Sequence, residues 1–226
     1  TLAAGDFVAQ RPAGADGVPV TDERTVEPVA PAPRAPTAGT VLDVVGIRLD
    51  DALNFRVDPD PSADIVVTAH PDVLERPENA VIIATGEATS RGTAVWWQVT
   101  VDGQEAWANS RYLGVLGSAG NAPELIDLEA IGDTELEDVV AEARPPTDAT
   151  GVLLDVVGQD AISTVFTIDV LGSYGNGLKG ERFDIEAWNV KAADPETMPQ
   201  VIGAKIMTAT RMPICEFGVD SGGGCL

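Results

Sequence analysis

The stretch Val95-Trp-Trp-Gln-Val-Thr-Val-Asp-Gly-Gln-Glu-Ala-Trp-Ala-Asn-Ser-Arg-Tyr-Leu113 decides the fold, because it places three of the four tryptophans around one tight turn. Side chains before the turn alternate between two faces, which is typical of a half-buried strand. The pair Asp102-Gly103 between two such runs is a strong signal for a two-residue hairpin turn. We expect Trp97 and Trp107 to anchor the core, because each buried indole removes about 150–250 Å² from water.

Other short apolar runs surround this hairpin in the sequence. They are separated by breaks rich in Gly, Pro or Asp, which favours an all-β barrel or sandwich. With the hairpin, the runs cover residues 41–45, 53–57, 65–68, 81–85, 95–101 and 105–109.

Two of these regions carry a family resemblance. The segment Asp51-Ala-Leu-Asn-Phe-Arg-Val-Asp-Pro-Asp-Pro61 resembles the opening of bacterial SH3-like domains, and Trp96-Trp-Gln-Val99, Glu105-Ala-Trp-Ala108 and Tyr112-Leu113 resemble the closing hairpin of that family. The resemblance covers residues 41–117. It implies a small antiparallel β-barrel without enzymatic activity, commonly exported and used for binding cell wall or proteins.

The sequence departs from the family pattern at Val57-Asp58, at Ala106 and in the segment 70–79, which looks like an insertion. These departures lie in or beside loops, so they bear on the ligand groove more than on the scaffold. Within the scaffold, Arg56 has two interpretations: its guanidinium either reaches a ligand carboxylate or ties a loop through hydrogen bonds. Trp96 and Tyr112 are the candidates for an exposed binding contact.

Composition limits the class of partner. The 226 residues carry a formal net charge of −22 with only 14 Lys and Arg, so electrostatic repulsion disfavours nucleic acid and anionic membrane surfaces. No apolar run is long enough to predict a membrane-spanning segment.

Residues 1–39 are rich in proline and alanine and predict a disordered stalk or linker. Such a segment either spaces the folded part from an export signal or lipid anchor upstream of the chain, or is a tail without a spacer role. Residues 40–117 form the SH3-like β-barrel in this interpretation.

The only two cysteines, Cys215 and Cys225, are separated by a glycine-rich loop that lets the sulfurs meet. We expect a disulfide rather than two thiols or a redox pair. A disulfide favours an oxidising compartment, so the sequence predicts a secreted or cell-envelope protein.

Residues 118–149 are strongly acidic and predict a linker that contains a short amphipathic helix. Thr134-Glu-Leu-Glu137 has the form of a capping box, and Pro145-Pro146 supplies a stop. The helix either docks on a domain or a partner, or remains marginal within the linker.

Residues 150–226 predict a second small β-domain, a β-sandwich or β-roll, with strands expected at 151–158, 163–171, 182–190, 201–210 and 211–217. Its family is not recognised from the sequence. Tyr174 and Trp188 are candidates for an aromatic binding patch, suited to a sugar.

Catalytic patterns are scarce. His70 is the only histidine and falls in the apparent insertion, so the sequence offers no Ser-His-Asp triad, Cys-His pair or multi-histidine zinc site. The acidic turn from Asp58 to Asp64 lacks the glycine and terminal glutamate of a calcium loop, which favours a solvated turn. We therefore assign no catalytic residue, metal or cofactor.

The leading hypothesis is a non-catalytic, secreted or envelope-associated bacterial binding module that recognises cell-wall peptide or an envelope protein. Two alternatives remain open: a hydrolase that uses paired carboxylates on wall polymer, and a structural component of an extracellular assembly. The sequence does not determine the oligomeric state.

Overall fold

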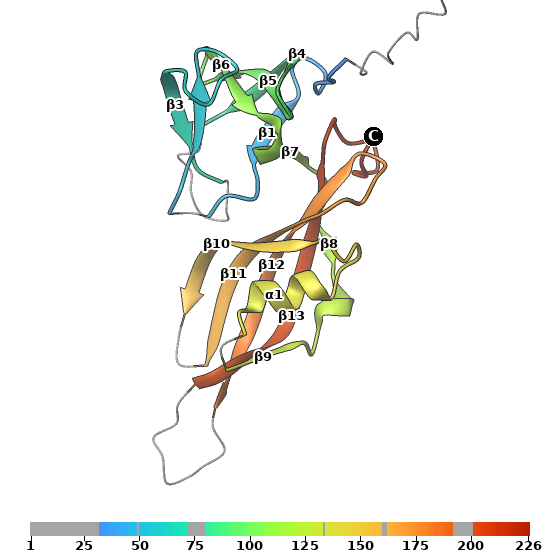
Figure 1. Ribbon diagram of the computed structural model, residues 1–226. Coiled ribbons are helices and arrows are strands. Elements are labelled where there is room, and N and C mark those ends of the chain that lie inside the picture. The colour runs from blue at the N-terminus through green and yellow to red at the C-terminus, as the bar shows by residue number, and fades with distance from the viewer. Residues whose placement is uncertain (1–31, 49, 72–79, 133, 160–161, 192–200) are drawn as a thin grey trace, which may run out of the picture. The chain divides into compact units, whose positions relative to one another are not determined.

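The computed structural model describes residues 32–48, 50–71, 80–132, 134–159, 162–191 and 201–226 (Figure 1). Residues 1–31, most of the expected stalk, and residues 72–79, most of the expected insertion, lie outside these ranges. The described chain is mainly β, as the sequence predicts: its strands join in one antiparallel network, and its described residues contain one α-helix.

The expected strands of the first half are all present, because each of the six apolar runs overlaps a strand. The strands are β1 (Val41–Val44), β2 (Leu53–Arg56), β3 (Ile65–Ala69), β4 (Ile82–Arg91), β5 (Ala94–Val101), β6 (Gln104–Asn109) and β7 (Leu113–Leu116). Their hydrogen-bonded order is β7-β1-β4-β5-β6-β2-β3. Phe55, Trp97 and Leu113 are fully buried in the hydrophobic core that these strands share.

The central hairpin is formed by β5 and β6, and both residues of its turn have positive φ, 49° at Asp102 and 82° at Gly103. Its register corrects one prediction. Trp107 lies opposite Gln98, on the face away from Trp97, and is only half-buried. Directly opposed residues share a face of the sheet. The side chains that β6 gives to the core are therefore the two alanines on either side of Trp107.

The last residues of the expected stalk pack on this core. The indole Nε1 of Trp97 donates a hydrogen bond to the carbonyl oxygen of Arg34 at 2.8 Å, and Ala35 contacts the core cluster. The guanidinium of Arg34 also lies 4.4 Å from the ring centroid of Phe217. Residues 32–39 thus belong to the folded unit, which begins at Ala32.

The acidic segment is docked rather than free. It contributes β8 (Gly120–Asn121), the 3-10 helix η2 (Pro123–Leu125), β9 (Glu129–Ile131) and α1 (Leu136–Glu142). Both β8 and β9 pair with the last strand, and Leu125, Val140 and Ala141 are buried in a second core cluster.

The helix starts one residue later than the capping box predicts. Glu135, in extended conformation, is the N-cap residue of α1, and its side chain makes no capping hydrogen bond. Glu137 turns inward and is buried. The carboxylate of Glu137 therefore does not serve as the returning partner of a Thr134 cap.

The C-terminal part is a single antiparallel meander with α1 across one face (Figure 1). Its strands are β10 (Thr150–Gln159), β11 (Ser163–Leu171), β12 (Leu178–Lys191) and β13 (Val201–Cys215). Ile168 and Ile185 point toward α1 and are buried in the second cluster. Residues 201–217, expected to form two final strands, contain the single strand β13. The four strands β10 to β13 pair in sequence order within one sheet. The expected β-sandwich or β-roll is therefore not formed.

The two halves share one open ladder. Strand β7 is connected to β13 by two residue pairs at its end, Val115 with Cys215 and Leu116 with Ile214. The path ends at β3 and β10 and does not return on itself, so the N-terminal strands do not form the closed barrel that the resemblance implies. The reason is that β7, with one edge on β1, uses its other edge for β13.

The predicted disulfide is present. Cys215, at the end of β13, is bonded to Cys225, with 5.1 Å between the two Cα atoms. Phe217 and Val219, in the loop that the bond closes, pack against the first core cluster. In the described part of the chain, no helix combines the length and the apolar character needed to cross a bilayer.

Candidate functional site: a polar cavity beside the central hairpin

A cavity of about 690 Å³ brings together three of the five predicted binding residues, Arg56, Trp96 and Tyr112. These residues come from β2, β5 and the 3-10 helix η1 (Ser110–Tyr112). Strand β2 is distant from the other two in sequence, but it lies beside β6, the strand that connects β5 to η1. The other described lining residues are Gly46, Ile47, Arg48, Asp50, Asp51, Ala52, Leu53, Asn54, Pro61, Asn109 and Val152.

Arg56 lies at the end of β2, where it is paired with Trp107. Its Nη1 donates a hydrogen bond to the carbonyl oxygen of Ala63 at 2.6 Å, which ties the turn between β2 and β3. This contact supports the loop-tying interpretation, while the position of Arg56 on the cavity keeps the ligand interpretation open. The guanidinium fork has several donors, so one side chain is able to serve both purposes.

Trp96 is not the exposed contact that the sequence suggested. Its side chain is 5% exposed, and it forms part of the cavity wall. Within the described ranges, its indole Nε1 is buried without a hydrogen-bond partner. A buried donor without an acceptor is unusual and costs free energy.

Tyr112 is half-buried at the end of η1. Asn109 begins this short helix by accepting a hydrogen bond from the backbone N–H of Arg111 at 3.0 Å. The guanidinium of Arg111 lies 5.8 Å from the Tyr112 ring centroid. Both Asn109 and Tyr112 line the cavity.

Apart from Arg56, sequence reasoning missed the charged residues of the cavity. Arg48, Asp50 and Asp51 come from the connection between β1 and β2, and all three are exposed. The Nη1 of Arg48 lies 3.7 Å from a carboxylate oxygen of Glu137, and its Nε lies 4.0 Å from Asp50. Burial, with a contribution from Glu135, raises the pKa of Glu137 above its ordinary value. The run of charges in this loop was the only sequence signal for them.

Tyr174 and Trp188 do not form the aromatic patch that the sequence suggested. Tyr174 lies in the loop before β12, where burial raises the pKa of its phenol beside Glu181 and Arg144. Trp188 is 48% exposed near the opposite end of β12, with its Nε1 3.3 Å from Glu186. At about 3.3 Å per residue along a strand, the segment of β12 from its first residue, Leu178, to Trp188 spans roughly 30 Å.

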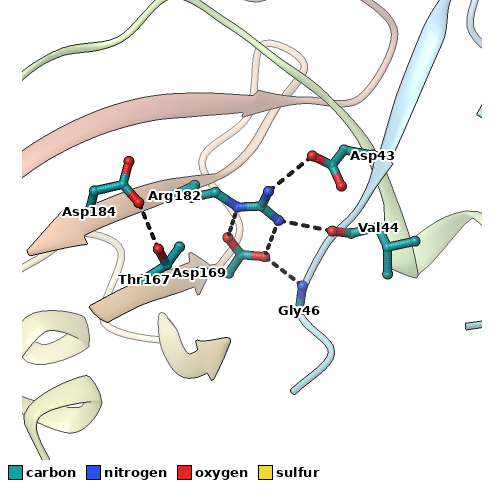
Figure 2. Close-up of polar contacts among 7 residues, drawn as sticks. All are labelled: Asp43, Val44, Gly46, Thr167, Asp169, Arg182 and Asp184. Atoms are coloured by element: carbon teal, nitrogen blue, oxygen red, sulfur yellow. Dashed lines mark hydrogen bonds and ion pairs between the residues drawn. The ribbon is translucent and has the colours of Figure 1, made fainter. Parts of the chain in front are cut away.

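The most buried charges form a separate cluster, shown in Figure 2. Arg182 donates from Nε to Asp169 at 2.8 Å and from Nη1 to Asp43 at 3.0 Å. Its Nη2 donates to the carbonyl oxygen of Val44 at 2.9 Å, and the amide of Gly46 donates to Asp169 at 2.8 Å. Although burial opposes its charge, Asp169 and Asp43 raise the pKa of Arg182.

This cluster connects β1 to β11 and β12, and its two central residues, Arg182 and Asp169, have no access to a ligand because they are 1% and 0% exposed. Lys179 makes a second connection: its Nζ donates to the carbonyl oxygens of Ser110 and Leu113. Burial lowers the pKa of Lys179 to about 8. We assign both groups to the joint between the two halves rather than to a site.

No metal site is found in the part of the chain that the structure describes, where no three His, Cys, Asp or Glu side chains are grouped to hold an ion. In the acidic turn once considered for calcium, Asp60 accepts hydrogen bonds from the Ser62 amide and hydroxyl and pairs with Arg91. These donors lower the pKa of Asp60. His70 is exposed, with Nδ1 2.8 Å from the Asp51 carbonyl oxygen.

No protein-family model matches this chain, and no curated protein or solved structure resembles it significantly.

Proposed function

We propose that this chain is a non-catalytic bacterial binding module of the SH3-like type, which takes a short cell-wall peptide or an extended peptide of an envelope protein into the cavity beside the hairpin. The observation that carries the proposal is the convergence of Arg56, Trp96 and Tyr112 on one cavity of about 690 Å³. This volume lies within the range of about 300–1,000 Å³ that is usual for ligand sites.

The chemistry of the cavity supports a zwitterionic peptide as ligand. Arg48 and Arg56 offer donors to a carboxylate, and Asp50 and Asp51 offer acceptors to an amine. Wall peptides carry both groups. The overall charge of −22 disfavours polyanions, which would otherwise compete for the two arginines.

An extracytoplasmic location is part of the proposal. The disulfide between Cys215 and Cys225 is compatible with it, because disulfides persist mainly in oxidising compartments.

The binding function is favoured over the carboxylate-dependent hydrolase. General acid catalysis near neutral pH needs a carboxyl group that keeps its proton, which enzymes usually achieve by burial. The two carboxylates on the cavity, Asp50 and Asp51, are exposed. The alternative of an assembly component would require self-association or a larger contact surface, which light scattering on the full chain measures directly.

The test is a titration of the full chain with soluble muropeptides, followed by isothermal calorimetry. We expect saturable binding that weakens by about tenfold in Arg48→Ala and Asp51→Ala, which remove exposed lining groups and leave the core intact. Arg91→Ala is the matched control, because Arg91 is an exposed ion-paired arginine outside the cavity.

Absence of binding at millimolar muropeptide, or equal affinity in all three variants, would overturn the proposal. Mass spectrometry of the same mixtures after prolonged incubation detects cleavage products, and their appearance would favour the hydrolase.

A further inference from the structure

A second cavity lies where the pairing of β1 with β7 stops. The two strands pair at Asp43 with Gly114 and at Val44 with Leu113. Continuing this antiparallel register would place Leu42 opposite Val115 and Val41 opposite Leu116. The described chain has no such pairs, and all four of these residues instead line a cavity of about 550 Å³.

The strands part because each turns to a different neighbour. At this point β1 pairs with β4, through Val41 with Ile83 and Leu42 with Ile82. The corresponding end of β7 pairs with β13. The edges of β1 and β7 that would face each other in a continued ladder therefore both border the cavity.

One side of this cavity is apolar and is formed by the loop that the disulfide closes and by Leu226, the residue after Cys225. Phe217, Val219 and Leu226 line it opposite β1 and β7. The aliphatic residues at its rim are unusually exposed: Val41 is 62% exposed, Val81 55% and Leu226 66%. Contiguous exposed apolar groups of this kind mark interaction sites in soluble proteins.

Most of the described charges around the cavity are acidic, but two cations also lie there: Arg34 is over the ring of Phe217, and Arg182 pairs with Asp43. Asp102 accepts a hydrogen bond from the Val81 amide at 3.1 Å, and Asp220 accepts one from the Gly222 amide at 2.7 Å in the disulfide-closed loop. Asp43 and His70 are the ionisable residues among the described lining. The excess of acidic groups and the net charge of −22 of the whole chain disfavour an occupant with acidic side chains, and one with neutral or basic side chains is complementary.

We propose that this cavity is a docking site for an extended segment of a partner protein, with apolar side chains at alternate positions and neutral or basic side chains between them. The segment adds as a strand between β1 and β7, a recognised mode of peptide binding in which main-chain hydrogen bonds supply affinity and alternate pockets supply specificity. The alternate apolar side chains contact Val41, Val81 and Leu226. Among the residues that the structure describes, this site shares no lining residue with the cavity beside the hairpin, so the two proposals stand independently.

The probe for the test is a short peptide with capped ends in which valine alternates with lysine. It is titrated into the ¹⁵N-labelled full chain while amide chemical shifts are recorded. We expect saturable shifts at Val41, Leu42, Val115 and Leu116. A peptide of the same length with glutamate in place of lysine should bind about tenfold more weakly.

Two changes separate strand addition from unspecific apolar contact. N-methylation of alternate backbone nitrogens in the peptide removes the main-chain donors and should weaken binding by about tenfold on the unaltered protein. In the protein, the double variant Val41→Glu with Val81→Glu should weaken binding of the parent peptide by at least about tenfold. Val57→Glu is the matched control, because Val57 is 51% exposed and lies outside the cavity.

The proposal is overturned if the methylated peptide binds as well as the parent peptide, if the shifts map elsewhere, or if no peptide binds up to its solubility limit. A dimer in light scattering that the Val41→Glu and Val81→Glu pair dissociates would also overturn it, since the occupant would then be a second copy of the chain.

Discussion

Replacing Arg182 with methionine is expected to lower the free energy of unfolding by about 3–5 kcal/mol, the usual cost of removing one partner of a buried ion pair. The structure supports a value in this range, because the variant leaves the carboxylate of Asp169, at 0% exposure, without its guanidinium partner. It also removes the hydrogen bond to the Val44 carbonyl oxygen and the ion pair with Asp43. Methionine fills much of the same volume, so a cavity contributes little to the loss.

The assay is urea unfolding at neutral pH, followed by tryptophan fluorescence and far-ultraviolet circular dichroism. With a slope of about 2 kcal/mol per molar urea, the loss corresponds to a midpoint lower by about 1.5–2.5 M. Because the cluster connects β1 to β11 and β12, we also expect the two signals to separate in the variant. Three tryptophans report on the first half of the chain, whereas circular dichroism reports on all strands.

Two further variants make the reasoning refutable. The double variant Arg182→Met with Asp169→Leu removes both charges and should be more stable than Arg182→Met alone, because an apolar pair carries no unpaired buried charge. The control Arg91→Met breaks an exposed ion pair with Asp60 and should change the free energy of unfolding by less than about 1 kcal/mol. A loss below about 1 kcal/mol in Arg182→Met, or a double variant less stable than the single one, would refute the account.

Three other predictions concern pH and the disulfide. The unfolded chain keeps the Lys179 proton up to its ordinary pKa of 10.5, whereas the folded chain releases it near pH 8, so stability should rise between these values by about 3 kcal/mol relative to Lys179→Met. Equal pH dependence of thermal unfolding in the two proteins would contradict this. Glu137 has a raised pKa when folded, so its contribution to stability is present below about pH 4.5 and is lost as pH rises through the folded value. Glu137→Gln should therefore be more stable than the parent chain at pH 7, with the gain vanishing at low pH; a gain independent of pH in denaturant titrations would argue against burial as the cause. Replacing Cys215 and Cys225 together by serine should cost about 2–4 kcal/mol in calorimetry, and an unchanged midpoint would show that the closed loop does not constrain the chain.

The sequence predicted three of the residues on the candidate site but not the site itself. Arg56, Trp96 and Tyr112 came from a family resemblance and from the chemistry of their side chains, and the structure places them on one cavity. Tyr174 and Trp188 were chosen for the same chemical reason and lie at opposite ends of β12. Aromatic character alone therefore did not determine which rings meet.

The prediction that Trp107 is buried in the core was wrong for a related reason. Both faces of β6 are plausible from sequence, because alanine and tryptophan are each compatible with a buried position. The register against β5 decides between them by placing Trp107 opposite Gln98. A shift by one residue would have exchanged the two faces.

The sequence by itself determined the features that depend on near neighbours: the positions of the strands, the Asp102-Gly103 turn and the meeting of two cysteines across a short loop. Only the tertiary structure decided the joining of β7 to β13, the open ladder, the two cavities and the partners of Arg182, which lie up to 139 residues away. The physical reason is the distance along the sequence between the residues that interact. Strand periodicity and turn conformation are set by adjacent residues, whereas the pairing of distant strands depends on packing and hydrogen bonding summed over the whole chain.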